Sequence, residues 1–175
     1  MEGKMNTKIL VAYATKYGST KEIAEKIAEV FSQADPDVDL LPVDQVKELD
    51  SYDAVVLGSG LYIGRWRKDA AKFLKSNQEI LSKKLVWLFS SGPTGEGDPV
   101  ELMKGWSFPK SLQSVADNIN PKDIAVFHGN LDRDKLSTIG KFMIKSVKAP
   151  LGDFRDWDNI NSWAKGILQV LQDQK

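Results

Sequence analysis

Short apolar runs alternate with amphipathic stretches along most of the chain. Runs of four to six residues rich in Val, Ile, Leu and aromatic side chains predict buried strands at 8–13, 38–43, 54–57, 85–89 and 124–127. Between them, apolar residues recur at helical spacing and predict helices at 21–31, at 68–74, around 112–119 and after Asp156 as N-cap. Strands that are apolar throughout and separated by helices are typical of a parallel sheet covered on both faces.

Right-handed crossover connections restrict how these strands can be ordered. They favour a doubly wound three-layer α/β sandwich with a five-stranded sheet of order 2-1-3-4-5. We expect a single domain over residues 1–175, with an insertion-like segment at about 129–155. In this architecture a ligand binds beyond the carboxyl ends of the strands, where the strand order reverses. The loops at 14–20, 58–66 and 90–99, which we call the first, second and third loops, are therefore the expected ligand-binding loops.

The loop at 14–20 combines a glycine with three hydroxyl side chains directly before a helix. The first turn of a helix leaves backbone N–H groups unpaired, and the helix dipole favours negative charge there. Because N-capping alone needs one hydroxyl, the cluster predicts a phosphate site. The sequence G-x-x-x-x-G-K-[ST] is absent, which excludes a P-loop. Ile63 stands where a dinucleotide fingerprint starting at Gly58 has its third glycine.

Residues 15–20 (Thr-Lys-Tyr-Gly-Ser-Thr) resemble the phosphate loop of flavodoxins, and residues 58–62 and 90–92 lie where that family keeps its flavin-ring loops. The chain is also similar to the menaquinone-dependent protoporphyrinogen dehydrogenase branch of the flavodoxin superfamily, at residues 58–64, 140–145 and 156–157. This resemblance implies an FMN-dependent oxidoreductase that acts on protoporphyrinogen IX with a quinone as acceptor. A flavodoxin-type electron carrier that serves a partner redox protein is the alternative.

The resemblance also implies which residues contact FMN. The first loop would bind the phosphate, Tyr62 would stack on the flavin ring with Trp66 as a substitute, and the third loop would meet the pyrimidine edge. The expected contacts are Thr15, Lys16, Tyr17, Gly18, Ser19, Thr20, Ser59, Gly60, Leu61, Tyr62, Ile63, Gly64, Ser90, Ser91, Gly92, Pro93 and Thr94. The flavin itself would carry the redox chemistry, and no metal is expected.

The second loop carries two further features. Flavodoxins stabilise one-electron-reduced flavin by flipping a peptide, which is cheap where a glycine adopts a positive φ. Ile63 is β-branched, and a left-handed backbone costs a non-glycine residue roughly 1–2 kcal/mol, so we expect two-electron chemistry. Arg65 and Arg67 would suit a carboxylate or phosphate of an anionic ligand, or else are solvated surface charges.

The segment between His128 and Asp156 is longer than an ordinary strand–helix connection. Apolar residues and lysines recur in it on neighbouring faces of a helix: Ile139, Phe142, Met143 and Val147, and Lys141, Lys145 and Lys148. We expect the apolar face to pack on the domain and the lysines to be solvated. The alternative is a helix that makes peripheral contact with anionic lipid or shapes a quinone-accessible mouth.

Composition excludes several classes of function. The 24 basic residues equal the 24 acidic residues in number, so bulk charge does not attract nucleic acid. The lack of cysteine excludes disulfides, thiolate metal sites and a cysteine nucleophile. We expect the one histidine, His128, to play a structural role at a strand end, with substrate contact or proton relay as the alternative. With no signal segment and no apolar run of about 20 residues, a cytoplasmic protein is expected.

Overall fold

The computed structural model describes residues 7–34 and 36–174. Its main sheet has five parallel strands in the order β2-β1-β3-β5-β6. The strands are β1 (Lys8–Ala14), β2 (Asp37–Pro42), β3 (Ala54–Tyr62), β5 (Leu85–Ser91) and β6 (Asp123–Phe127). In terms of the five predicted strands this is the order 2-1-3-4-5, so the predicted doubly wound sandwich is confirmed. A short antiparallel strand that the sequence pattern does not predict, β4 (Arg65–Trp66), pairs with the end of β3.

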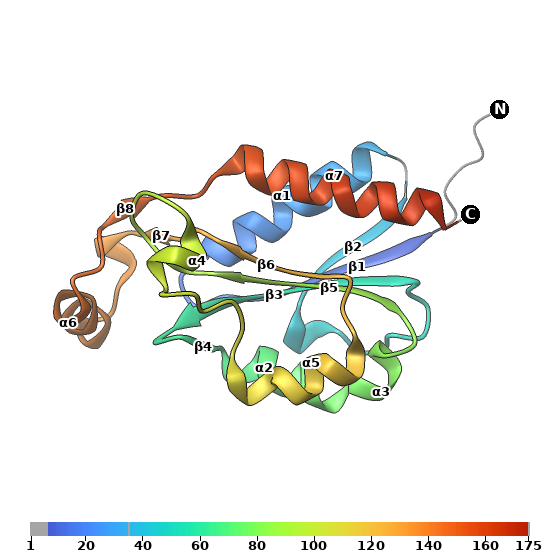
Figure 1. Ribbon diagram of the computed structural model, residues 1–175, viewed down its shortest axis with the longest axis horizontal. Helices are drawn as coiled ribbons and strands as arrows, with labels where there is room; N and C mark the ends of the chain where they lie inside the picture. Colours follow the sequence, from blue (N-terminus) through green and yellow to red (C-terminus); the bar gives the residue numbers. More distant parts are fainter. Residues whose placement is uncertain (1–6, 35, 175) are drawn as a thin grey trace.

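Helices cover both faces of the sheet (Figure 1). One face carries α1 (Ser19–Gln33) and α7 (Trp157–Asp173), and the other carries α2 (Lys68–Ser76), α3 (Gln78–Leu81) and α5 (Gln113–Ile119). Each helical layer packs on its own apolar cluster. Val55 and Val56 are neighbours in β3, yet Val55 belongs to the cluster under α2 and α5 and Val56 to the one under α1 and α7. Both faces of the strand are buried, which explains why it is apolar throughout.

Short elements complete the connections. They are η1 (Val43–Gln45), α4 (Pro99–Leu102), η2 (Lys110–Leu112) and η3 (Arg133–Lys135). The predicted N-cap of the last helix is confirmed, because the carboxylate of Asp156 accepts a hydrogen bond from the backbone N of Asn159 at 3.0 Å.

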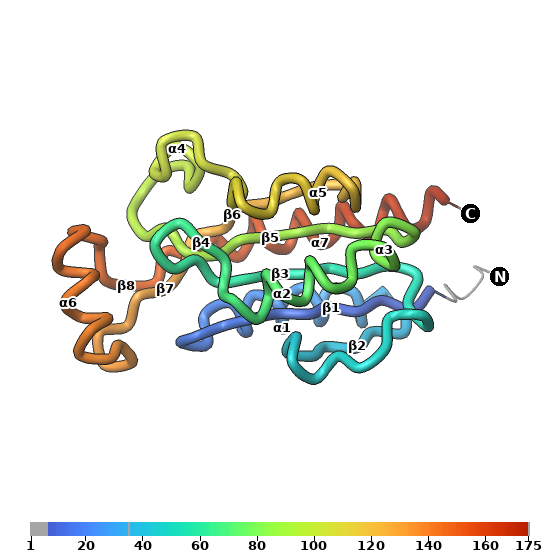
Figure 2. Tube along the Cα trace, turned by 90° about the horizontal axis from the view of Figure 1, so that it is seen from below, coloured from blue at the N-terminus to red at the C-terminus, as the bar shows by residue number. Residues whose placement is uncertain are grey.

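The segment between β6 and α7 forms an arm at the carboxyl end of the sheet. Its base is the antiparallel pair β7 (Asn130–Leu131) and β8 (Gly152–Asp153), and its tip is α6 (Thr138–Val147). Figures 1 and 2 both show α6 standing beyond the end of the sheet that is opposite to the start of β1. The predicted helix is confirmed, but it stands off the domain rather than lying along it.

The prediction that the apolar face of this helix packs on the domain is wrong. Ile139, Phe142 and Val147 are 71, 74 and 65 % exposed. Gly140 is the one buried residue of α6, and Met143 and Ile144 are half-buried. The reason is geometric: the two-stranded base places the helix beyond the end of the sheet, so that only one narrow side of it reaches the rest of the molecule.

Candidate functional site

The three predicted loops and the arm enclose a cavity of about 950 Å³ beyond the carboxyl ends of β1, β3 and β5. This volume lies near the top of the range of roughly 300–1,000 Å³ that is usual for small-molecule sites. All the expected cofactor contacts line the cavity except Gly18, Ser59 and Ser90. The arm adds lining residues that sequence reasoning did not assign to the cofactor site: Asn130, Leu131, Leu136, Gly140, Met143, Ile144, Val147, Lys148, Ala149 and Pro150.

The first loop leaves the start of α1 open to an anion. Gly18 is the N-cap residue, with a left-handed φ of 92°, and within the described residues no side chain caps the helix. Instead the hydroxyl of Thr15 accepts a hydrogen bond from the backbone N of Gly18 at 3.0 Å, and the hydroxyl of Ser19 accepts one from the backbone N of Asn130 at 3.2 Å. The hydroxyls thus shape the loop, and helix geometry leaves the first-turn amides for a ligand.

Two buried hydroxyls at the cavity have no hydrogen-bond partner within the part of the chain that the structure describes. They are Oη of Tyr17 and Oγ1 of Thr94, and both residues line the cavity. A buried hydroxyl left unpaired costs about 1–3 kcal/mol. Each is therefore a ready hydrogen-bonding group for a polar ligand. Together with the amides of α1, they fit a ligand that combines a phosphate with a polar ring or chain.

Tyr62 lies between the first loop and the arm. The ammonium of Lys16 lies 4.4 Å from the centre of the Tyr62 ring, and the Tyr62 hydroxyl donates to the sulfur of Met143 at 3.1 Å. The ammonium of Lys16 also lies 5.1 Å from the centre of the Tyr17 ring, and its interaction with Tyr17 is the largest cause of the raised pKa of Lys16. The aromatic side chain expected to stack on a flavin therefore stands at the cavity wall, beside a cation and in contact with α6.

Trp66, the substitute for this stacking role, lines the cavity but is held against the core. It is 5 % exposed, its Nε1 donates to the hydroxyl of Ser90 at 2.8 Å, and its ring meets Phe108 edge-on at 5.3 Å between centroids. Ser90 is fully buried by this contact. Ser59 is fully buried as well, and its hydroxyl accepts from the backbone N of Arg67 at 3.0 Å. The side chains of Ser59 and Ser90 thus fasten the β3–β4 hairpin and do not face the cavity.

His128 fastens the third loop. Its Nδ1 lies 3.1 Å from the carbonyl oxygen of Pro93, and its Nε2 lies 2.7 Å from that of Gly97. The residue is 9 % exposed and does not line the cavity. These contacts agree with the expected structural role, since both ring nitrogens are engaged with main-chain carbonyls of one loop.

The backbone at Ile63 differs from expectation. Ile63 has a φ of 51° and Gly64 a φ of 65°, and the pairing of Tyr62 with Arg65 leaves these two residues as the turn of a β-hairpin. Positive φ at both central residues is the pattern of a type I′ turn. Sequence reasoning took the left-handed conformation as costly for Ile63, but the hairpin imposes that conformation. The expectation of two-electron chemistry loses this structural basis.

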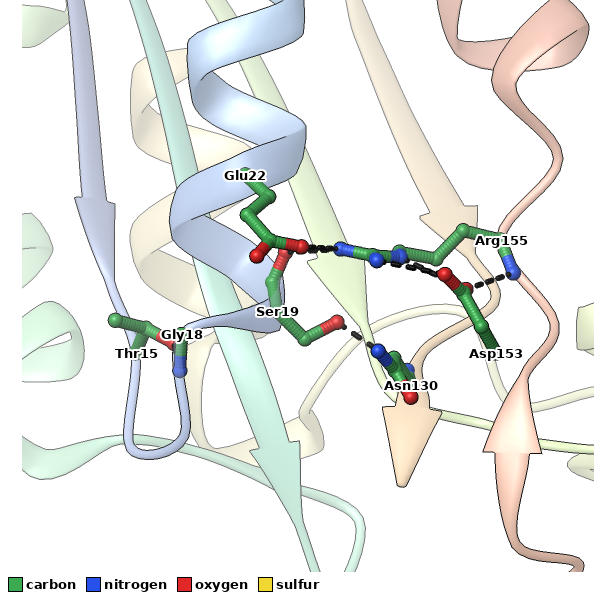
Figure 3. A network of polar contacts seen from close by, with 7 residues as sticks. All are labelled: Thr15, Gly18, Ser19, Glu22, Asn130, Asp153 and Arg155. Atoms are coloured by element: carbon green, nitrogen blue, oxygen red, sulfur yellow. Dashed lines mark hydrogen bonds and ion pairs between the residues drawn. The ribbon is translucent and has the colours of Figure 1, made fainter. Parts of the chain in front are cut away.

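A charged network that sequence reasoning missed joins the arm to the first loop (Figure 3). Arg155 follows β8, and its side chain is 5 % exposed. It forms ion pairs with Asp153 at 2.7 Å and with Glu22, and it donates to the carbonyl oxygen of Ser19 at 3.4 Å. Burial is the largest influence on Arg155 and opposes its charge, but the hydrogen bonds and charges of Asp153 and Glu22 outweigh it and raise its pKa. A lone arginine after a two-residue strand carries no sequence signal of such a role.

A parallel sheet of this order, with an open helix N-terminus at its switch point, is typical of nucleotide-binding α/β proteins. The family model of the flavodoxin domain matches residues 10–158, and the chain belongs to this family. Membership of the family implies that the chain binds a flavin cofactor and is an oxidoreductase. The recognition made from the loop residues is thereby confirmed.

The chain shares low sequence identity with the proteins that it resembles. The chain is 22 % identical, over 93 % of its length and 96 % of the relative's, to protoporphyrinogen IX dehydrogenase [quinone] of Escherichia coli (strain K12). It is 30 % identical, over 52 % of its length and 59 % of the relative's, to NAD(P)H dehydrogenase (quinone) of Afipia carboxidovorans. The structure matches that of a short-chain flavodoxin associated with a non-canonical PDU bacterial microcompartment, with a TM-score of 0.63, 15 % identity and coverage of 94 % of this chain and 99 % of the other.

Proposed function

We propose that this chain is an FMN-dependent oxidoreductase that oxidises a reduced tetrapyrrole of the protoporphyrinogen IX type and passes the electrons to a quinone. Bound FMN supplies the redox chemistry, and the protein binds, orients and shields the reactants. Support for the reaction class comes from the family and from the two quinone-linked relatives described above.

The residues at the cavity suit FMN group by group. The amides at the start of α1 would hold the phosphate, which the helix dipole further stabilises. The unpaired hydroxyls of Tyr17 and Thr94 would bind polar groups of the ligand. Gly92 lets the third loop pass close to Leu61, because a Cβ on Gly92 would lie 2.7 Å from that of Leu61. Tyr62 at the cavity wall would contact the ring system.

The charge of the cavity lining carries the proposal of an anionic substrate. Its cationic side chains are Lys16, Arg65, Arg67, Lys68 and Lys148, against Asp69 as the one acidic side chain among the lining residues. Asp69 is paired with Arg67 at 3.3 Å. Apolar side chains such as Leu61, Met143 and Ile144 form the adjoining wall. A flat apolar macrocycle that bears carboxylates would match both features, with arginine well suited to pair with carboxylates.

Anaerobic turnover tests this proposal. FMN-loaded protein is mixed with protoporphyrinogen IX and a water-soluble quinone, and porphyrin fluorescence is followed. The double variant Arg65→Gln with Lys68→Gln should raise the KM for the tetrapyrrole about tenfold, with less effect on kcat, because the charges act in binding. Lys72→Gln with Lys75→Gln, on the exposed side of α2, is the matched control. Yellow protein without any turnover would contradict the substrate, and protein that takes up no FMN would contradict the whole proposal.

A flavodoxin-type electron carrier is the second candidate, supported by the structural likeness to a short-chain flavodoxin. A carrier exchanges electrons with a partner redox protein and turns over no small substrate. The assay above separates the two candidates, because a carrier would bind FMN fully and leave protoporphyrinogen unchanged.

A further inference from the structure

Exposed apolar side chains gather at one end of the molecule. Among the described residues the large apolar side chains that are exposed are Ile63, Leu102, Ile139, Phe142, Val147 and Leu151. We call these six residues the apolar rim. Ile63, Leu102 and Val147 line the cavity, Leu151 follows the lining residue Pro150, and Ile139 and Phe142 lie next to the lining residues Gly140 and Met143. Apolar residues concentrated around one mouth mark an interaction surface.

The arm presents the largest part of the apolar rim. Four of the six residues lie in the segment 139–151, which stands beyond the end of the sheet (Figure 2). Phe142 and Ile139 are the most exposed of the set, at 74 and 71 %. A projecting helix with exposed apolar side chains can insert into the acyl region of a lipid bilayer without a concave partner surface. Docking on a protein would require a preformed groove that matches the helix.

The charge of the arm selects an anionic partner. The segment 138–151 contains Lys141, Lys145 and Lys148 and no acidic residue. Acidic side chains at this end of the molecule lie at the base of the arm, at Asp132, Asp134 and Asp153, and in the third loop and α4, at Glu96, Asp98 and Glu101. The tip of the arm at α6, rather than its base or α4, is therefore the part that an anionic surface attracts. Long lysine side chains can keep their charge at a headgroup layer while neighbouring apolar residues go deeper.

Ile63 gives independent support. It is 67 % exposed and its backbone is held at a φ of 51°, so neither packing nor conformational preference explains a β-branched apolar residue there. Strained residues that persist in a fold are concentrated at functional sites. Contact of the cavity mouth with the apolar interior of a lipid bilayer would explain why an exposed apolar side chain stands there.

We propose that the arm docks the cavity mouth onto the surface of an anionic lipid bilayer, with Ile139 and Phe142 inserted among the acyl chains and Lys141 and Lys145 at the headgroups. No helix among the described residues is long and apolar enough to cross a membrane, so the contact is peripheral. The inference rests on the proposed function in one respect: a quinone acceptor dissolved in lipid would then reach the cavity without crossing water. A second copy of the chain is a poorer occupant, because a two-fold contact through the arm would bring six lysines together.

Vesicle binding tests the proposal directly. FMN-loaded protein is sedimented with sucrose-loaded vesicles of phosphatidylcholine containing 30 % phosphatidylglycerol, and with vesicles of phosphatidylcholine alone. We expect binding to the anionic vesicles that weakens as salt is raised. Lys141→Gln with Lys145→Gln should weaken it about 25-fold, at about fivefold for each lysine. Phe142→Ser with Ile139→Ser should weaken it at least tenfold at every salt concentration, because apolar insertion is not screened.

The control removes the same charge elsewhere. Lys75→Gln with Lys165→Gln, at exposed positions of α2 and α7, should bind vesicles as the unchanged chain does. None of the four substituted arm residues lines the cavity, so FMN content and reduction of a water-soluble quinone should stay unchanged in both arm variants.

Three results would overturn the proposal. One is no sedimentation with anionic vesicles at millimolar lipid, and another is equal binding by the arm variants. The third is a concentration-dependent dimer that Phe142→Ser dissolves in the absence of vesicle binding, which would assign the arm to a second copy. Failure of the proposed function would look different, as loss of FMN binding or of turnover in solution while the vesicles are still bound.

Discussion

Arg155 and Glu22 are 133 positions apart in the chain, and their side chains form an ion pair that ties the base of the arm to the first turn of α1 (Figure 3). The same guanidinium pairs with Asp153 and donates to the carbonyl of Ser19, so one side chain connects the base of the arm to the first loop. Because Glu22 is an acidic group near the expected phosphate site, its neutralisation by Arg155 also lowers the electrostatic cost of placing an anion there.

The first prediction follows from this network. Arg155→Met should weaken FMN binding about tenfold, since Glu22 loses its counter-ion and the first turn of α1 loses a hydrogen bond. It should also lower the free energy of unfolding by about 1–2 kcal/mol, less than for a fully buried pair, because Glu22 and Asp153 are both about half exposed. Fluorescence titration of FMN and urea unfolding provide the measurements. Arg133→Met, at an exposed position of η3, is the control, and equal behaviour of the two variants would contradict the assigned role.

Acid should weaken the same network. The side-chain hydrogen bond from Arg155 lowers the pKa of Asp153 below its ordinary value, against an opposing effect of burial. A carboxyl whose pKa is lower in the folded state stabilises the fold above its unfolded pKa of about 3.9, and that contribution is lost as the pH falls towards the depressed value.

Urea unfolding of the unchanged chain and of Asp153→Asn between pH 6 and pH 3 checks this. The unchanged chain should be more stable than the variant at pH 6, and the difference should shrink as the pH falls below about 4. Asp50→Asn, an exposed position, should show no such convergence. A difference between the unchanged chain and Asp153→Asn that is independent of pH would contradict the assignment.

The sequence predicts the parts of this molecule that depend on local pattern. Apolar strands such as β3 and the cap at Asp156 follow from neighbouring residues, and the first loop could be recognised from its own six positions. The exposure of Phe142 could not be predicted, because periodicity shows that a helix has an apolar face without showing whether anything covers it. The left-handed conformation of Ile63 could not be predicted either, because the pairing of Tyr62 with Arg65 imposes it and the residue type does not favour it.

The third loop depends on His128. The ring bridges the carbonyls of Pro93 and Gly97, and a neutral imidazole has one N–H to donate, so at least one of these hydrogen bonds forms in every protonation state. His128→Phe keeps an aromatic ring at this position and removes both contacts. Amide hydrogen exchange at residues 94–98 should become at least tenfold faster, and FMN binding should weaken because Thr94 belongs to this loop.

A matched variant separates the hydrogen bonds from the shape of the ring. His128→Gln retains a side-chain donor and should show slower exchange in residues 94–98 than His128→Phe. If both variants exchange as the unchanged chain does, the histidine does not hold the loop.

The hairpin at Ile63 provides the last prediction. In a two-residue turn with positive φ at both positions, Asn followed by Gly is the preferred pair, and this chain has Ile63 followed by Gly64. Ile63→Asn should therefore raise the free energy of unfolding by about 1 kcal/mol, since asparagine tolerates the left-handed conformation and little burial is lost at a side chain that is 67 % exposed. In a domain of this size the melting temperature should rise by roughly 2–4 °C. Ile63→Val keeps the β-branch and should change stability little. If Ile63→Asn stabilises the protein no more than Ile63→Val does, the turn is not strained by Ile63. If Ile63→Asn is the more stable variant, the chain carries an exposed apolar residue at the cavity mouth where asparagine would stabilise the turn. This is expected for a residue that contacts lipid.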